Sequence, residues 1–63
     1  MEEYKQKYNK LLKRYYNGCE YLKKNPSEFD FYFNDLLKIL DELAKIVDNH
    51  PEMTKEEISN GFK

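Results

Sequence analysis

Two long segments of the chain repeat apolar residues at three- and four-residue steps, and only a short turn separates them. The first segment ends at Lys24 and the second begins at Glu28, with Asn25, Pro26 and Ser27 between them. Apolar side chains at these steps lie on one face of a helix, which advances about 100° per residue. Two helices of similar length joined by so short a turn must lie antiparallel. The sequence therefore predicts an all-α fold, a long antiparallel helical hairpin.

The first helix is predicted over about residues 3–24. Gly18 lies beside its apolar face, where it costs roughly 1 kcal/mol of helix propensity but permits close approach of a neighbouring helix. Pro26 ends the helix, because the residue before a proline avoids helical backbone angles. The apolar face is formed by Tyr4, Tyr8, Leu11, Leu12, Tyr15, Cys19 and Leu22.

The second helix is predicted over about residues 28–48, with Ser27 as its N-cap. Its first stretch, EFDFYF from Glu28 to Phe33, would as a strand place three phenylalanines on one side and Asp30 and Tyr32 on the other. The much longer helical period that follows outweighs this short alternation, so we interpret the stretch as the start of a helix. We expect a central stripe to pack against the first helix, namely Phe29, Phe33, Leu36, Leu40, Leu43, Ala44 and Val47.

A short third helix is predicted over about residues 55–60. Thr54 and Glu57 have the spacing of a capping box, and Met53 and Ile58 have that of a hydrophobic staple. Gly61 is placed to end this helix. We expect it to cover the open end of the hairpin, so that residues 1–63 form one small helical domain.

No catalytic, cofactor or metal-binding motif is present in the sequence, and we expect a non-enzymatic protein without a cofactor. Cys19 lies on the apolar face of the first helix, whereas His50 follows the second helix at the opposite end of the hairpin, so the two cannot form a catalytic pair. A core of this size supplies only ~3–5 kcal/mol, and a single cysteine cannot form an internal disulfide. Self-association or a partner is the expected additional source of stability.

Apolar runs are short and the amino terminus is charged, which argues against a membrane span and a signal peptide. With one free thiol, the chain is expected in the cytoplasm. Ten lysines accompany a single arginine, together with many Asn, Ile, Tyr and Phe residues. This usage suggests an AT-rich genome, such as that of a low-GC bacterium, one of its phages or a mobile element.

A basic stripe follows helical steps along the first helix. Residues 1–25 carry seven basic and three acidic side chains, whereas residues 26–63 carry four basic and nine acidic ones. The stripe could contact nucleic-acid phosphates or an acidic protein, or it could face the acidic edges of the second helix. A net charge of −1 disfavours nucleic acid. The stripe consists of Lys7, Lys10, Arg14, Asn17, Tyr21 and Lys24.

The apolar arc of the second helix spans almost 180°, which is wider than one neighbouring helix covers. Tyr32, Ile39 and Ile46 repeat at seven-residue spacing along one flank of the arc. We expect this flank to be exposed and to bind a second copy of the chain, giving a homodimer, or another protein. Two alternatives remain: the C-terminal segment covers this flank, or the chain is a monomer whose flank stays exposed.

Phe31 lies about 160° from the central stripe, so a helix that starts at Glu28 leaves its ring in water. A later start would instead let Phe31 fold over Leu22. An exposed Phe31 near Tyr32 and Tyr21 would form an aromatic patch with the anatomy of a binding hot spot. The sequence thus favours a protein-interaction module, such as a small adaptor, inhibitor or regulatory subunit. The alternative is a nucleic-acid-associated regulator that uses the basic stripe.

Overall fold

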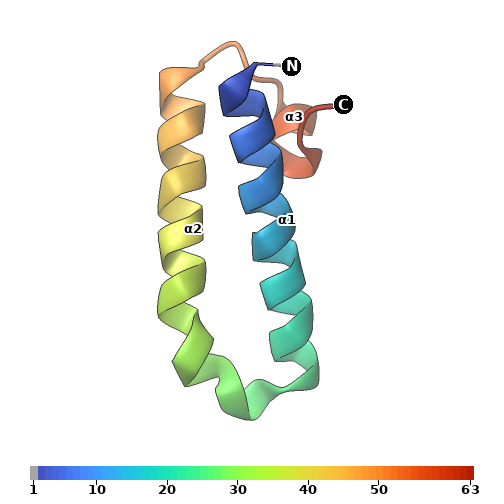
Figure 1. Cartoon of the computed structure of the whole chain (residues 1–63), viewed down its shortest axis with the longest axis vertical. Helices are drawn as coiled ribbons and strands as arrows, with labels where there is room; N and C mark the ends of the chain where they lie inside the picture. Colours follow the sequence, from blue (N-terminus) through green and yellow to red (C-terminus); the bar gives the residue numbers. More distant parts are fainter. Residues whose placement is uncertain (1) are drawn as a thin grey trace.

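The computed structural model of the chain describes residues 2–63, and it contains two long helices and a short third one (Figure 1). The elements are α1 (Glu3–Lys24), a 3-10 turn η1 (Pro26–Glu28), α2 (Phe29–Asn49) and α3 (Lys55–Asn60). α1 and α2 run antiparallel side by side, and α3 lies beside α1 at the open end of the hairpin. The molecule is elongated, with extents of 38 × 19 × 19 Å. The predicted all-α hairpin with a short C-terminal helix is confirmed.

The closed end of the hairpin departs from the prediction at Ser27. α1 ends at Lys24, and the Asn25 side chain donates a hydrogen bond to the Tyr21 carbonyl oxygen over 3.0 Å. Ser27 lies inside η1, and α2 has no side-chain cap. The expected Ser27 cap is wrong because the 3-10 turn leads directly into α2, so that Ser27 is part of the helical path rather than the residue before it.

The core lies between α1 and α2 and extends under the segment before α3. At mid-hairpin, the Leu36 side chain packs directly over Gly18: a Cβ added at Gly18 would lie 2.7 Å from Leu36 Cδ2. The predicted close approach at this glycine is therefore confirmed. The buried apolar residues are Tyr8, Leu11, Leu12, Leu22, Ile39, Leu43 and Met53.

The face that α2 turns towards α1 is rotated from the predicted one on the helical wheel, because the core takes Ile39 and Ile46 together with Leu36, Leu43 and Val47 of the predicted stripe. Ile39 is only 8% exposed and Ile46 packs against the core, whereas Phe29, Phe33 and Leu40 of the predicted stripe are 47%, 40% and 40% exposed. The expectation that the flank of Tyr32, Ile39 and Ile46 is exposed is wrong for Ile39 and holds for Tyr32, which is 41% exposed, whereas Ile46 is half-buried. Periodicity defines the width of the apolar arc, but not which part of it faces the neighbouring helix.

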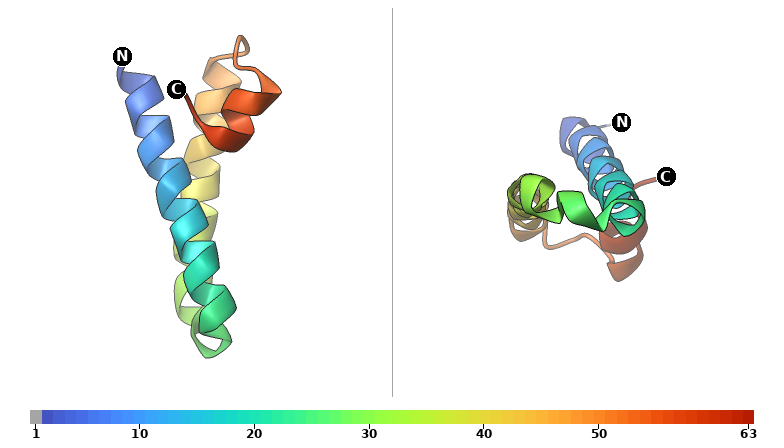
Figure 2. Two further views of the ribbon diagram at one scale, coloured as in Figure 1. Left: turned by 90° about the vertical axis from the view of Figure 1, so that its right-hand side faces the viewer. Right: turned by 90° about the horizontal axis from the view of Figure 1, so that it is seen from below.

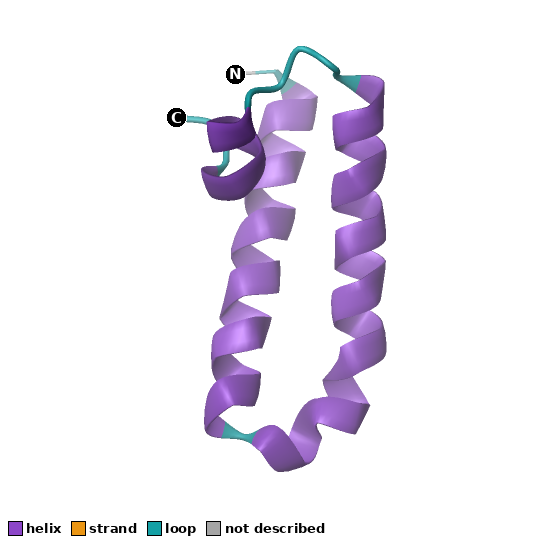
Figure 3. Cartoon of the chain, turned by 180° about the vertical axis from the view of Figure 1, so that it is seen from behind, coloured by secondary structure: helices purple, strands orange, loops and turns teal. Residues whose placement is uncertain are grey.

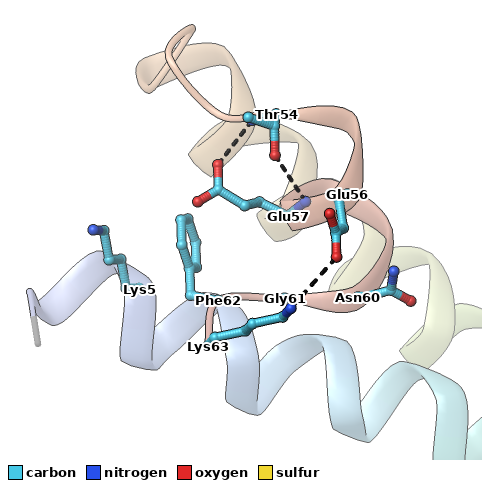
Figure 4. Close-up of a pocket in the computed structure, with 8 residues that line it drawn as sticks. All are labelled: Lys5, Thr54, Glu56, Glu57, Asn60, Gly61, Phe62 and Lys63. Carbon is cyan, nitrogen blue, oxygen red and sulfur yellow. Dashed lines mark hydrogen bonds and ion pairs between the residues drawn. The ribbon is translucent and has the colours of Figure 1, made fainter.

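α3 begins and ends at the signals read from the sequence (Figure 4). The Thr54 backbone N–H donates to Glu57 Oε1 over 2.8 Å, and the Glu57 backbone N–H donates to Thr54 Oγ1 over 3.2 Å. This reciprocal pair is a capping box. Gly61 follows the helix with φ of 84°, a left-handed angle that glycine adopts without steric cost.

Two tyrosines of α1 hold α3 against the hairpin. The Tyr8 hydroxyl donates to the Ile58 carbonyl oxygen over 2.5 Å, and the Tyr16 hydroxyl donates to the Ser59 carbonyl oxygen over 2.7 Å. Because Tyr16 lies two turns further along α1 than Tyr8, α3 points towards the closed end. The Ile58 side chain packs against the core between the long helices.

The chain reverses direction after α3. The Asn9 side chain donates to the Phe62 carbonyl oxygen over 2.9 Å and accepts from the Phe62 N–H over 2.7 Å. The Phe62 ring packs edge-on against Tyr4 and Tyr8, with centroids 5.6 and 5.8 Å apart. Gly61 therefore turns the chain back towards the open end, and α3 covers only that half of the hairpin (Figures 2 and 3).

Candidate protein-binding groove

A shallow apolar groove runs between α1 and α2 on the face that carries α3. Towards the open end, Ile58 and Ser59 of α3 form part of its wall. The groove continues past Tyr15 and Leu40, which line both halves, to the closed end. We call this uncovered half the tip groove; its lining is Tyr15, Cys19, Leu22, Lys23, Phe29, Phe33, Leu36, Leu37 and Leu40.

Four side chains of α2 leave much of their apolar surface in water along the tip groove. Phe29 is 47% exposed, Phe33 40%, Leu37 46% and Leu40 40%. The Phe29 and Phe33 rings contact each other, with centroids 4.9 Å apart. An aromatic side chain has an area of about 200 Å², so the four residues together expose roughly 300 Å² of apolar surface. This area lies in the range of the largest apolar patch on a typical monomeric protein, and such patches are often functional.

The floor of the tip groove is formed by side chains that also pack within the hairpin. Leu22 is buried, while Leu36 and Cys19 are half-buried. A side-chain hydrogen bond between Tyr15 and Cys19, which favours the neutral phenol, raises the pKa of Tyr15 above its ordinary value. The floor is therefore formed by residues that hold α1 and α2 together, and the exposed residues of α2 stand on one wall.

Charged residues line the two edges of the tip groove. On the wheel of α2, Asp30 and Asp41 follow directly outside Leu37. Asp41 forms an exposed ion pair with Lys45, at 3.1 Å. On the α1 side, Lys23 is part of the lining. The α2 edge of the groove is thus acidic, and the α1 edge carries a lysine.

The predicted aromatic patch at the closed end is divided between two surfaces. Tyr21 and Tyr32 meet edge-on, with centroids 5.5 Å apart, as expected. The Tyr21 hydroxyl donates to the Glu28 carboxylate, which raises the pKa of Tyr21 to about 12. Phe31 is 80% exposed, so the alternative in which it folds over Leu22 is wrong. Phe31 lies about 180° from Leu40 on the wheel and does not line the tip groove.

The basic stripe lies along the opposite side of the contact between α1 and α2. Lys7, Lys10 and Arg14 line a shallow groove together with Glu42 of α2. Arg14 also shares a groove with Asp35, Tyr21 and Tyr32. Carboxylates therefore stand beside the stripe, as the sequence suggested. Across residues 2–63, however, none of the ion pairs joins α1 to α2. Lys24 is exposed at the end of α1.

His50, which follows α2, is half-buried at the open end of the hairpin. Its ring stacks on Tyr4, with centroids 3.6 Å apart and planes 7° from parallel, and its Nδ1 lies 3.1 Å from Glu52 Oε1. Among the described residues, no group of three or more His, Cys, Asp or Glu side chains could hold a metal ion. No helix within residues 2–63 has both the length and the apolarity needed to cross a membrane.

Another pocket, beside α3, is lined mostly by polar residues, and its charged side chains already form contacts within the chain (Figure 4). Glu57 belongs to the capping box, and Glu56 pairs with Lys63 at 3.7 Å. Lys5 stands 5.3 Å from the centre of the Phe62 ring. These contacts stabilise the C-terminal segment and leave no convergent set of polar groups for a ligand.

Comparison of the chain with known protein families, curated proteins and solved structures found no match. A function for the chain therefore rests on its surfaces, of which the tip groove is the most apolar. The sequence placed Phe29, Phe33 and Leu40 in the core and so missed this site. The width of the apolar arc on α2 was the signal that some apolar surface stays uncovered.

Proposed function

We propose that this chain is a non-enzymatic protein-interaction module, a small adaptor, inhibitor or regulatory subunit, which binds another protein through the tip groove. The observation that supports it is the row of four neighbouring apolar side chains on α2, each 40–47% exposed. Burial of roughly 300 Å² at about 25 cal/mol per Å² gives ~7 kcal/mol from this chain alone. Association itself costs a free energy of the same order, because translational and rotational freedom is lost. The partner must therefore contribute a comparable apolar surface.

Phe31 offers a separate candidate contact on the outer face of α2, since its ring is 80% exposed. One partner helix could not touch both Phe31 and the tip groove, because they lie on opposite sides of α2. Tyr21 and Tyr32 adjoin neither surface directly, and they pair with each other on the side of the basic stripe. A role of Phe31, Tyr21 and Tyr32 in binding stays a prediction, as do a cytoplasmic location and a phage origin.

The alternative, a nucleic-acid-associated regulator, receives less support from the surface around the basic stripe. Glu42 and Asp35 stand beside Lys7, Lys10 and Arg14, and a phosphate chain would approach these carboxylates as well as the cations. Anisotropy of a labelled generic duplex, titrated with the chain at several salt concentrations, distinguishes the two functions. Nucleic-acid binding gives a steep negative salt slope, whereas we expect no binding at physiological salt.

The test of the proposed function is selection of peptides from a random library on the full chain. Binders are then measured against Leu37→Glu, which puts a charge into the tip groove. Lys38→Glu is the matched control on the outer face of α2. We expect Leu37→Glu to weaken binding at least roughly tenfold and Lys38→Glu to leave it unchanged. Leu37→Ala serves as a second variant if circular dichroism shows that Leu37→Glu is unfolded.

The proposed function is wrong if the selection yields no binder, or if the selected binders tolerate both Leu37 variants. Binders that lose affinity only with Phe31→Ala would move the site to the outer face of α2.

A further inference from the structure

In its open-end half the groove is bordered by three helices. Ile58 and Ser59 of α3 line it together with residues of α1 and α2, and the Ile58 side chain packs against the core. Tyr15 and Leu40 line both halves, so the tip groove continues between the same two long helices, where α3 no longer borders it. A third helix packed beside α1 and α2 at the closed end would therefore extend an arrangement that the chain already uses at the open end.

α3 stops well before the closed end. The Ser59 carbonyl is held by Tyr16, and after Gly61 the chain turns back to Asn9. The tip groove extends from Tyr15 to Lys23 on α1, about 12 Å at 1.5 Å per residue. Along α2 it extends from Phe29 to Leu40, about 16 Å. This length takes a helix of about three turns.

A second copy of the chain fits this surface poorly. α3 stands on one half of the face, so a facing copy could use only the other half, whose exposed apolar side chains offer roughly 300 Å² of accessible surface. Stable protein interfaces bury about 800 Å² on each partner. A single peptide helix, anchored by a few side chains at i, i+3 or i+4, and i+7, matches a small apolar groove.

The edges of the tip groove define the charge that such a helix should carry. Asp30 and Asp41 stand outside Leu37 on the α2 edge, and Lys23 lies on the α1 edge. Lysine or arginine on the side of the helix that meets α2 would complement Asp30, and it would compete with Lys45 for Asp41. Exposed pairs of this kind change affinity by only a few-fold each, but they decide which partner and which orientation bind.

We infer that the occupant of the tip groove is an amphipathic helix of a partner protein, about three turns long and basic along the edge that meets α2. Together with α1 and α2 it forms a three-helix bundle at the closed end of the hairpin. This inference rests on the proposed protein-binding function and adds the shape and the charge of the partner.

Two synthetic peptides of about eighteen residues test it, long enough to form helix in solution. Both carry the same leucine stripe on an alanine background, and one edge carries lysine in the first peptide and glutamate in the second. Each is titrated into the isotope-labelled full chain and followed by amide resonances. We expect the lysine peptide to shift Leu22, Phe33 and Leu37 and to bind about five-fold more tightly. The double variant Asp30→Asn with Asp41→Asn should abolish this preference.

The outcomes separate the two proposals. Equal binding of both peptides at the tip groove overturns the basic-edge inference and leaves the proposed function standing. If neither peptide shifts the tip groove while library-selected binders do so in an extended conformation, the helical occupant is wrong. A concentration-dependent dimer in sedimentation that Leu37→Glu dissociates shows that the occupant is a second copy. If no binder of any kind depends on Leu37, the proposed function itself fails.

Discussion

Replacing Ile39 with alanine should destabilise the hairpin far more than the same replacement of its neighbour Leu40. Each substitution removes three carbon atoms, worth ~2.4 kcal/mol when fully buried. Ile39 is 8% exposed and enclosed by the core, so its loss costs ~2 kcal/mol of transfer and about 1 kcal/mol for the cavity left behind. Leu40 is 40% exposed beside an open groove, so its loss costs ~1.4 kcal/mol without an enclosed cavity.

Urea unfolding followed by far-UV circular dichroism measures this difference of about 2 kcal/mol. A core of this size supplies only ~3–5 kcal/mol, so Ile39→Ala leaves little stability. Ile39→Val, expected to cost about 1 kcal/mol, gives a measurable value if the alanine variant is unfolded. Equal costs for Ile39→Ala and Leu40→Ala would show that the stripe of Phe29 and Leu40 faces α1. The tip groove would then be buried, and the proposed site would be refuted.

Three further results are expected. Thr54→Ala should cost ~1 kcal/mol and accelerate amide exchange across Lys55–Asn60, because the capping box is lost; unchanged exchange would contradict this. Phe31→Ala should leave the melting temperature nearly unchanged, since the ring is 80% exposed; a large decrease would place Phe31 in the core. Glu28→Gln should lower the Tyr21 pKa from about 12 towards 10.0, measured by carbon NMR of the ring. Because folding raises this pKa, the hydrogen bond stabilises the fold below the unfolded pKa and is lost as the pH rises through about 12.

Features that depend on a few neighbouring residues could be read from the sequence. Pro26 ends α1, and Thr54 and Glu57 form their capping box because both partners lie within one turn. Gly61 adopts the left-handed angle expected after a helix. The prediction at Ser27 was wrong because the same residues can also form a 3-10 turn. That turn continues into α2 without a side-chain cap.

The candidate site could be predicted only in part. The sequence indicated a surplus of apolar surface on α2 and placed it on the flank of Ile39 and Ile46. The structure buries Ile39 and exposes Phe29 and Phe33, which belonged to the predicted central stripe. Apolar residues stand on both sides of the wide arc, so helical period alone cannot decide which of them face α1. The choice depends on how side chains of α1 and α2 interlock, above all where Leu36 packs over Gly18.

The sequence by itself determined the two amphipathic helices, their antiparallel pairing and the ends of the short third helix, because helical period, turn length and caps are local properties. Only the tertiary structure decided the rotation of α2 and the extent of the cover that α3 provides. That cover depends on hydrogen bonds between distant residues, from Tyr8 and Tyr16 to the carbonyls of α3, and on the pairing of Asn9 with Phe62. Because these non-local contacts hold α3 at the open end of the hairpin, the tip groove at the closed end stays uncovered.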